Sequence, residues 1–462
     1  MTTTRASADP EGVLPRTALH PSLSAPLLDT MTFLNEVTLR YPQAISFAPG
    51  RPYEGDFDVA RVPGLIETYL DHLRGRGLSE ERVRTALYQY GETAGQIRDI
   101  VARMLEVDED MTVDPAAVVV TVGCQEAVLL TLRALFTGPD DVLLVDSPAY
   151  VGITGAASLL DIPVVPVPGT PNGPSLEGLE RTVREIEASG RRARCLYVVP
   201  DCSNPTGVSM RREDRTALLD AAGRLGLLLL EDNPYGVFSS VRRPTLKSLD
   251  TERRVVYLGS FAKTAFPGAR VGFVVADQLV AGADGRPPGL LAEELAKVKS
   301  MVTVNTSSLS QAAVAGLLLQ NGGGLRSANE TSARHYQATM RCLRETLAAE
   351  LPPGSPETDG VRWNDPDGGF FLTLDVPFEA DEAALDVSAE KYGVIWTPMR
   401  HFHLDDAGDR QIRLSCSYLT TDRAAEGAAR LARFVKDGRA PDPPGPLNCR
   451  GRSASPAPPR RR

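Results

Sequence analysis

Long apolar runs, a leader segment and excess positive charge are all missing from this sequence. No apolar stretch approaches the ~20 residues that a membrane-spanning helix requires. The start of the chain lacks the basic segment and apolar core of a signal peptide. A formal net charge of -9 disfavours a nucleic-acid surface. We therefore expect a cytoplasmic protein that binds neither membranes nor nucleic acids.

Cysteine and histidine are sparse, and their spacing indicates neither disulfides nor a metal centre. The six cysteines form no CxxC pair, so reduced thiols are expected rather than a disulfide framework. His401 and His403 form an isolated HxH without a nearby cysteine. A surface or packing role is favoured over metal binding for this pair, and we expect no metal site.

The chain is long enough to form more than one hydrophobic core. Its 462 residues, 42% of them apolar and 24% charged, are typical of a soluble enzyme with two domains. Apolar runs that suit strands buried on both faces alternate with helical stretches. The rhythm changes after about residue 335 to a long helix, a strand near Gly369 to Val376, and a helix-strand-helix ending. We predict an α/β fold, with a three-layer large domain around a mostly parallel central sheet and a smaller α/β C-terminal domain.

These patterns also predict element positions and domain limits. The expected strands of the large domain lie at residues 116–122, 141–145, 162–167, 195–199, 227–230, 255–258 and 271–275, and a helix is expected at 125–136. The expected parts are a flexible arm at 1–28, a segment joining the small domain at 29–70, the large domain at 71–330, the small domain at 331–436, and a disordered Pro- and Arg-rich tail at 437–462.

A lysine in a loop of small residues directly follows one predicted strand. Lys263 lies three residues after Ser260 and seven before Arg270. An amine can bond to an aldehyde and later move a proton at a substrate carbon. A hydroxyl with a fixed guanidinium can hold a phosphate. Together these groups describe a seat for pyridoxal 5'-phosphate, whose ring withdraws electrons. The alternative is the surface position that lysines usually take.

Two further segments follow predicted strands and can bind parts of such a cofactor. Gly123-Cys124-Gln125 stands between a strand and a helix, where backbone amides bind anions. A plain strand-helix turn is the alternative. Asn204, within Asp201 to Gly207, can donate its amide to a phenolate-like oxygen, and a turn without a ligand explains this segment equally well.

Carboxylate, phenol and guanidinium groups complete the candidate set. Asp232 follows a predicted strand and can pair with a protonated pyridine nitrogen, and Tyr235 can bind the ring hydroxyl. A solvated or capping role is the alternative for this pair. Arg413 lies in a predicted strand in which polar and apolar residues alternate. If its side chain faces inward, it can bind a carboxylate through two hydrogen bonds; the alternative is a charged side chain that faces solvent. Because chemistry in open α/β sheets collects at the carboxyl ends of strands, we expect these groups to converge.

Taken together, these segments resemble the fold-type I pyridoxal-phosphate aminotransferases of class I/II, over about residues 30 to 436. The resemblance rests on Tyr90-Gly91 with Gly95, Gly123-Cys124-Gln125, Asp146 to Tyr150, Asn204-Pro205-Thr206-Gly207, Asp232 to Tyr235, Ser260 to Arg270, and Arg413. It implies cofactor roles as follows: Lys263 as the Schiff-base lysine, Asp232 on the pyridine nitrogen, Asn204 and Tyr235 on the ring oxygen, Tyr150 on the ring face, and the Cys124 and Gln125 amides with Ser260 and Arg270 on the phosphate.

The same resemblance implies a substrate site and a homodimer. Arg413 resembles the arginine that binds the substrate α-carboxylate, and Gly50 the loop glycine beside it. Tyr90 resembles a tyrosine that reaches the phosphate or substrate from the neighbouring subunit, so active sites shared between two copies are expected. Ala262 and Cys124 depart from the family pattern, which often has serine at both positions. Neither change removes an essential group.

Two segments near the N-terminus resemble narrower branches of the family. Ala44 to Pro52 resembles the 2-aminoadipate and kynurenine aminotransferase II branch. Leu28 to Glu36 resembles aminotransferases of peptide-antibiotic pathways, among which the 3,5-dihydroxyphenylglycine enzymes are the narrowest match. Arg51 can favour acidic substrates, and Tyr53, Phe370 and Phe371 aryl ones, although core or rim positions explain these residues equally well.

We therefore expect a transaminase that moves an amino group between an L-amino acid and a 2-oxo acid. The expected donor is aromatic or an arylglycine, with a 2-aminoadipate or glutamate type as the alternative. Elimination or cyclisation on the same cofactor is a second alternative. A ligand-sensing regulator needs a DNA-binding module, and the ~30 residues ahead of the fold are too few and too proline-rich for one. A silent scaffold is disfavoured because Lys263, Asp232 and Arg270 are all present.

Overall fold

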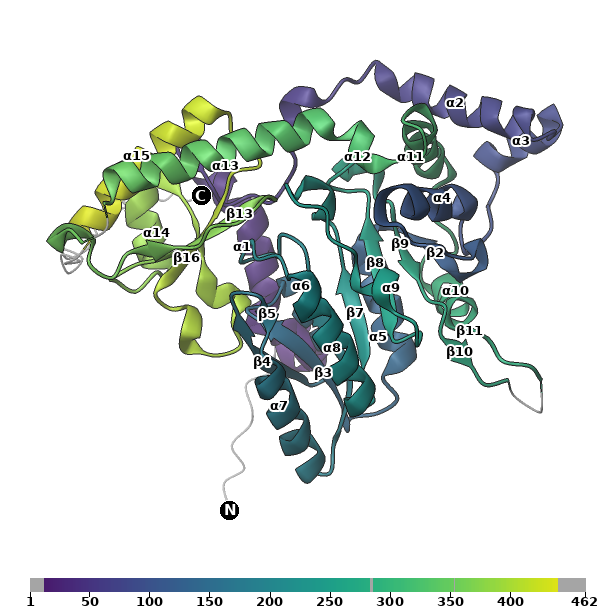
Figure 1. Ribbon diagram of the computed structural model, residues 1–462, viewed down its shortest axis with the longest axis horizontal. Coiled ribbons are helices and arrows are strands. Elements are labelled where there is room, and N and C mark those ends of the chain that lie inside the picture. The colour runs from purple at the N-terminus through teal and green to yellow at the C-terminus, as the bar shows by residue number, and fades with distance from the viewer. Residues whose placement is uncertain (1–11, 283–285, 353, 439–462) are drawn as a thin grey trace, which may run out of the picture.

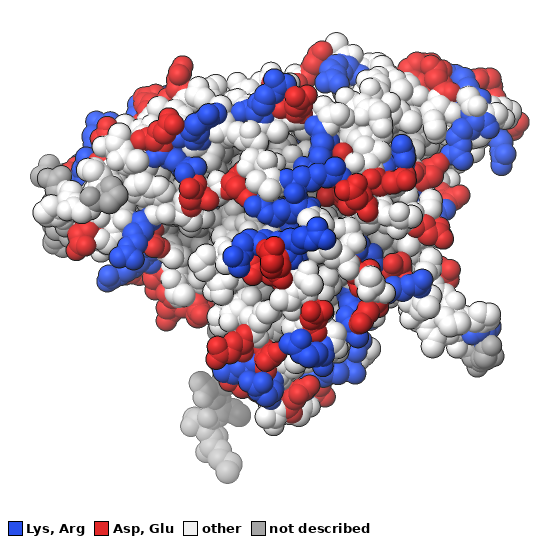
Figure 2. Space-filling view, in the orientation of Figure 1, with Lys and Arg blue, Asp and Glu red and all other residues white. Residues whose placement is uncertain are grey.

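Helices and strands alternate through most of the chain, and they assemble around two separate sheets (Figure 1). The computed structural model describes residues 12–282, 286–352 and 354–438. Among these residues, no helix is both long and apolar enough to cross a membrane. On the face seen in Figure 2, lysine and arginine side chains are interspersed with aspartate and glutamate.

The larger sheet has eight strands in the order β2-β9-β8-β7-β6-β3-β4-β5. Their bounds are β2 Val118–Thr121, β3 Asp141–Ser147, β4 Val164–Thr170, β5 Gly173–Pro174, β6 Arg192–Val198, β7 Leu228–Asp232, β8 Val255–Ser260 and β9 Gly272–Val275. The strands from β4 through β3, β6 and β7 to β8 pair in parallel. Strand β9 is antiparallel to both β2 and β8, and β5 is antiparallel to β4. The prediction of a mostly parallel sheet is confirmed.

Helices cover both faces of this sheet. The helices on one face are α5 (Gly123–Leu135), α6 (Val151–Leu159) and α10 (Leu291–Val302), and those on the other include α7 (Leu176–Ala188) and α8 (Arg212–Leu225). Strand β3 is fully apolar at its centre because Leu143 and Val145 enter one core while Val142 and Leu144 enter the other. A third core joins β2 and β9 to α2 (Arg61–Gly75), α3 (Glu80–Tyr88), α4 (Arg98–Glu109) and α11 (Ser308–Gln320).

The smaller sheet lies beside the larger one. It has the order β12-β13-β16-β15, all antiparallel, with bounds β12 Arg362–Trp363, β13 Phe371–Asp375, β15 Thr397–Pro398 and β16 Gln411–Ser415. The long helix α13 (Glu330–Glu350) runs from the larger sheet across this part and packs on α15 (Thr421–Asp437), as Figure 1 shows. Strand β1 (Ile45–Ser46) pairs with β14 (Val394–Ile395). Just after β1, the Phe47 carbonyl accepts a hydrogen bond from the amide of Ser415 on β16 at 2.7 Å, which places the loop that carries Gly50 beside the smaller sheet.

The remaining elements are short or peripheral. They are α1 (Pro26–Arg40), α9 (Leu246–Leu249), α12 (Leu325–Ala328), α14 (Glu382–Val387), β10 (Leu279–Val280) and β11 (Gly289–Leu290). The expected limit between residues 70 and 71 falls inside α2, and α1 begins within the expected N-terminal arm. Parts of the expected arm and tail, residues 1–11 and 439–462, lie outside the described residues. The division into domains therefore stays a prediction.

Some predicted strand limits were displaced by local backbone chemistry. The strand expected from residue 116 begins at Val118, because Pro115–Ala117 form a 3-10 turn capped by the Asp114 side chain. The strand expected at 162–167 lies at Val164–Thr170, since β4 tolerates Pro166 and Pro168 next to the short strand β5 near the end of the sheet.

A buried ion pair braces the turn between β6 and α8. The Arg215 side chain is fully buried and donates to both carboxylate oxygens of Asp201, at 2.6 and 3.0 Å. It also donates to the carbonyls of Pro200, Met210 and Pro244. Arg215 thereby ties both ends of the segment that contains Asn204 to the helix that follows it.

We predict that Arg215→Met lowers the free energy of unfolding by about 3–5 kcal/mol, because it leaves the buried carboxylate of Asp201 without its cation. The double variant Asp201→Asn, Arg215→Met should recover much of the loss. Urea unfolding followed by circular dichroism measures both. Arg211→Met, at an exposed pair with Asp214, is the control and should leave the unfolding midpoint nearly unchanged. An equally small effect of Arg215→Met would contradict the bracing role.

Candidate active site

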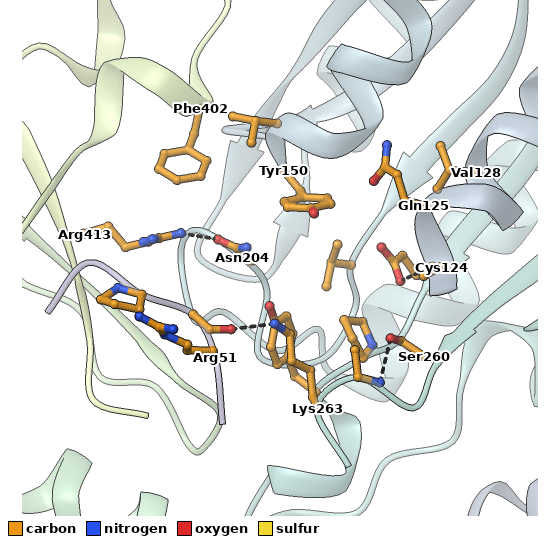
Figure 3. A pocket seen from close by; sticks show the side chains of 18 of the residues that line it. Arg51, Cys124, Gln125, Val128, Tyr150, Asn204, Ser260, Lys263, Phe402 and Arg413 are labelled. Carbon is orange, nitrogen blue, oxygen red and sulfur yellow. Dashed lines mark hydrogen bonds between the residues drawn. The ribbon is translucent and has the colours of Figure 1, made fainter. Parts of the chain in front are cut away.

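A cavity of about 340 Å³ opens at the carboxyl edge of the larger sheet, where the smaller sheet meets it. It gathers residues from strand ends that lie far apart in the sequence, and Figure 3 shows their side chains turned toward a common space. The predicted residues that line it are Gly50, Cys124, Gln125, Tyr150, Asn204, Asp232, Tyr235, Ser260, Lys263, Arg270 and Arg413. The expected convergence at the strand ends is therefore observed.

Tyr90 is the one predicted site residue that does not line this cavity. It follows α3, and 83% of its surface is exposed. The expectation for Tyr90 was a contact with a neighbouring subunit, so its exposure in a single chain leaves that role a prediction.

Asp232 ends strand β7 as a buried carboxylate, 4% exposed. The hydroxyl of Tyr197 donates to its Oδ2 at 2.6 Å, and the thiol of Cys124 donates to its Oδ1 at 3.5 Å. Burial raises the pKa of Asp232 to about 6, and these two donors and the charge of Lys263 oppose the rise. At neutral pH the group is therefore mainly a carboxylate, held deep in the cavity and able to take a further proton donor.

The sequence reasoning missed Tyr197. It lies on β6 and carries a polar group within the apolar run of residues 195–199. A single tyrosine in a strand buried on both faces needs a partner for its hydroxyl. That requirement is the signal that could have identified Tyr197 as a partner for an acidic residue on the next strand.

Lys263 follows β8, and its amine projects into the cavity. Nζ donates to the carbonyl oxygen of Gly50 at 2.5 Å, on the loop that strand β1 anchors to the smaller sheet. Burial, together with the charges of Arg413 and Arg270, lowers the pKa of Lys263 to about 8 against the opposing charge of Asp232. A substantial fraction of this amine is therefore neutral near pH 8, which is the form that attacks an aldehyde.

Arg413 faces inward from β16, as the predicted carboxylate-binding role requires. Nη1 donates to Asn204 Oδ1 at 2.7 Å and Nη2 to the carbonyl of Ala48 at 2.7 Å. The guanidinium lies over the rings of Phe371 and Phe402, at 4.6 and 4.8 Å from their centroids. Burial lowers the pKa of Arg413 to about 10. Among the described residues its buried Nε has no hydrogen-bond partner.

The anion-binding end of the cavity is built around the start of α5. The helix begins at Gly123, whose backbone has a φ of +70°. A side chain at this position would lie 2.4 Å from Nη2 of Arg270, so the guanidinium packs directly over the glycine. The free amides of the first turn, Arg270 and the Ser260 hydroxyl thus surround one end of the cavity. This end suits a phosphate group.

Several residues that were left open as substrate contacts can now be placed. Arg51 lines the cavity and stays partly exposed, with its guanidinium 4.8 Å from the centroid of the Tyr418 ring. Phe370 and Phe371 are fully buried core residues that do not line it. Tyr53 stacks on His335 instead. Phe402 does line the cavity, and the sequence reasoning missed it because it lies in a short 3-10 helix, Met399–Phe402, after β15.

Comparison with known proteins agrees with this geometry. The family described as aminotransferase class I and II matches residues 54–431. The chain is 49% identical to (S)-3,5-dihydroxyphenylglycine transaminase of Amycolatopsis orientalis over 90% of this chain and 93% of that protein. It is 30% identical to 2-aminoadipate transaminase of Thermus thermophilus, over 88% and 94% respectively. The crystal structure of the Thermus thermophilus alpha-aminoadipate aminotransferase LysN, complexed with N-(5'-phosphopyridoxyl)-L-leucine, superposes with a TM-score of 0.73 at 28% identity, covering 91% of this chain and 98% of that one.

We predict that Lys263 titrates near pH 8 in the protein without cofactor, not near its ordinary value of 10.5. Competitive labelling with acetic anhydride, read by mass spectrometry of the Lys263 peptide, gives the midpoint. Asp232→Asn removes a charge that raises this pKa and should move the midpoint down. Arg413→Gln removes a charge that lowers it and should move the midpoint up. A wild-type midpoint above pH 10, or shifts of the opposite signs, would contradict the arrangement.

Proposed function

The chain belongs to the class I and II aminotransferases, and we propose that it uses pyridoxal 5'-phosphate in the cavity around Lys263 to move an amino group between an L-amino acid and a 2-oxo acid. The observation that carries the cofactor proposal is the convergence of Asp232, Lys263 and Arg270 on one cavity at the carboxyl edge of the larger sheet. The relative LysN, crystallised with a phosphopyridoxyl amino acid, supports it.

The residues present fit this cofactor. The start of α5 with Ser260 and Arg270 would hold the phosphate, and Asp232 would accept a hydrogen bond from the pyridine nitrogen. Asn204 and Tyr235 would bind the ring oxygen, and Tyr150 would lie on the ring face. When bound, pyridoxal phosphate supplies an aldehyde that takes up the amino group and a ring that withdraws electrons from the substrate.

The side chains of this chain account for the other requirements of amino transfer. Arg413 would bind the substrate α-carboxylate, which gives its unpartnered Nε an acceptor. Phe371 and Phe402 hold the guanidinium between them, and its bond to Asn204 orients it. Lys263 Nζ, with its lowered pKa, would carry a proton to and from the substrate Cα. Asp232 would stabilise a protonated ring nitrogen, which strengthens the electron withdrawal that the ring supplies.

For the amino donor we propose an arylglycine, such as 3,5-dihydroxyphenylglycine. The 49% identity to a transaminase of that compound over nine-tenths of the chain supports this substrate. The apolar and aromatic side chains of Val151, Tyr150 and Phe402 on the cavity wall are compatible with an aryl ring held close to Arg413. Arg51 favours the alternative, a donor with a side-chain carboxylate, such as 2-aminoadipate.

Single-turnover absorbance measurements with the cofactor-loaded protein separate these donors. We predict that 3,5-dihydroxyphenylglycine converts the cofactor to pyridoxamine phosphate with a kcat/KM at least about tenfold above those of 2-aminoadipate, glutamate and tyrosine. The reverse order would establish the acidic-donor alternative, and Arg51→Ala should then selectively weaken 2-aminoadipate. Consumption of donor without any pyridoxamine phosphate would contradict transamination and indicate elimination.

We also propose a homodimer with shared active sites. Met301, Tyr90 and Tyr88 are 85%, 83% and 81% exposed, and Val302 and Val304 are each half exposed. The segments that carry them are held together, since the amide of Gln96 donates to Gln311 at 2.9 Å and the side-chain amide of Gln311 donates to Thr306. An apolar patch of this kind on a folded chain indicates an interaction surface. A second copy covering it would bring Tyr90 to the partner's cavity.

Hybrid dimers test this sharing. Lys263→Ala should be inactive and Tyr90→Ala impaired when each is alone. Mixing them after reversible dissociation should recover about a quarter of wild-type activity, because half of the dimers are hybrids and each hybrid has one intact site. A mixture of Lys263→Ala and Asp232→Ala is the matched control and should recover nothing, as both defects lie on the same chain's cavity. No recovery with Tyr90→Ala would contradict the shared site.

A further inference from the structure

A second and larger cavity, about 720 Å³, lies on the far side of the turn that carries Asn204. Its walls come from the end of β3, from β4, from the turn at residues 203–210, and from the loops around the smaller sheet. Val199 lines both cavities. The proposed amino-transfer chemistry uses no group in this second space.

Two buried acceptors face this cavity without a partner. Asp146 Oδ1 and His403 Nε2 are buried, and neither has a hydrogen-bond partner among the described residues. The His403 side chain is only 9% exposed, and its Nδ1 lies 3.4 Å from Asp405 Oδ1. Among the described residues Nδ1 makes no regular hydrogen bond either, but the neighbouring carboxylate favours the proton on Nδ1, which leaves Nε2 as the acceptor. Each buried acceptor of this kind costs free energy until a donor reaches it.

The acidic side chains that line the cavity favour a positively charged hydrogen-bond donor. Four aspartates line the cavity, namely Asp146, Asp365, Asp367 and Asp405, and no lysine or arginine does. Asp365 pairs with Arg344, Asp367 pairs with Arg243, and Asp405 faces His403. Asp146 alone among them has neither an arginine nor a histidine partner within the described residues. Burial, with no compensating charge, raises the pKa of Asp146 to about 7. A cation beside it would restore the carboxylate.

The rest of the lining mixes hydroxyl and amide side chains with a substantial apolar part. The rings of Pro148, Pro166 and Pro168 and the side chains of Met210 and Met399 contribute to it. Such walls suit a carbon skeleton rather than a bare metal ion, which prefers several oxygen ligands.

We propose that this cavity binds a small organic amine, with its ammonium group on Asp146, an apolar body against the prolines, and a second donor on His403 Nε2. The binding of an amine to this cavity does not depend on the proposed transaminase activity. The effect of that binding on the active site does rest on the proposed activity. Asn364 donates to the carbonyl of Thr206 at 2.5 Å, two residues from Asn204, which in turn binds Arg413. An amine that fills the cavity presses on this turn and should change KM for the substrate whose carboxylate Arg413 binds.

The probe must not react with a cofactor aldehyde. N,N-Dimethyltyramine meets this condition, because it has an ammonium N–H, an aryl body and a phenol but no primary amine. 4-Ethylphenol is the matched compound without the cation. Isothermal titration calorimetry with the cofactor-loaded protein should show one N,N-dimethyltyramine per chain, and at least about tenfold weaker binding of 4-ethylphenol.

Variants place the probe. Asp146→Asn should weaken N,N-dimethyltyramine at least about tenfold, and His403→Phe should weaken it several-fold. Asp365 lines the same cavity but already pairs with Arg344. The Asp365→Asn variant should therefore bind N,N-dimethyltyramine with an affinity within about twofold of that of the wild-type protein. Retained cofactor absorbance and melting temperature show that each variant is folded. If Asp146→Asn does not fold, the location of the binding site is tested with His403→Phe and with a crystal soaked with the probe.

Absence of binding to the wild-type protein, equal binding of 4-ethylphenol, or unchanged binding by the Asp146 and His403 variants would overturn the site. Binding without transaminase activity would refute the proposed function and leave the amine site standing. Binding with activity but no change in KM would overturn the coupling through Asn204.

Discussion

The site depends on charge buried at one edge of a parallel sheet. Asp232, Lys263 and Arg413 all lose water there, and burial is the main cause of each shifted pKa, upward for the acid and downward for the two bases. Each pKa is thus shifted in the direction that favours the neutral form of the group. A ligand that brings a phosphate, a cationic ring nitrogen and a carboxylate supplies the charges that these groups lack. The same burial that costs stability therefore creates affinity for that ligand.

The remainder of the fold keeps these groups in place. Parallel strands bring their carboxyl ends to one edge, so residues on β6, β7 and β8 meet although the chain between them forms helices. The pairing of β1 with β14 carries the Gly50 loop to Lys263. The Arg215–Asp201 pair braces the turn that carries Asn204. The smaller sheet contributes Arg413, so both sheets line the cavity.

The sequence could predict those parts of this arrangement that depend on residues close together along the chain. Continuous apolar runs predicted the strands, and polar residues directly after them predicted Asp232, Lys263 and Asn204, because both signals are local. Tyr197 and Phe402 were missed because their partners lie 35 and 11 positions away along the chain. Only folding brings them together. The antiparallel direction of β9 and the side chains left unpartnered around the second cavity likewise depend on contacts that no local pattern encodes.

The proposal that Lys263 bonds covalently to pyridoxal phosphate in this cavity can be tested by sodium borohydride reduction of the cofactor-loaded protein, followed by digestion and mass spectrometry. We expect a single phosphopyridoxyl group on the peptide that contains Lys263, and none in Lys263→Ala. A label on another lysine, or the same extent of labelling in Lys263→Ala, would contradict it.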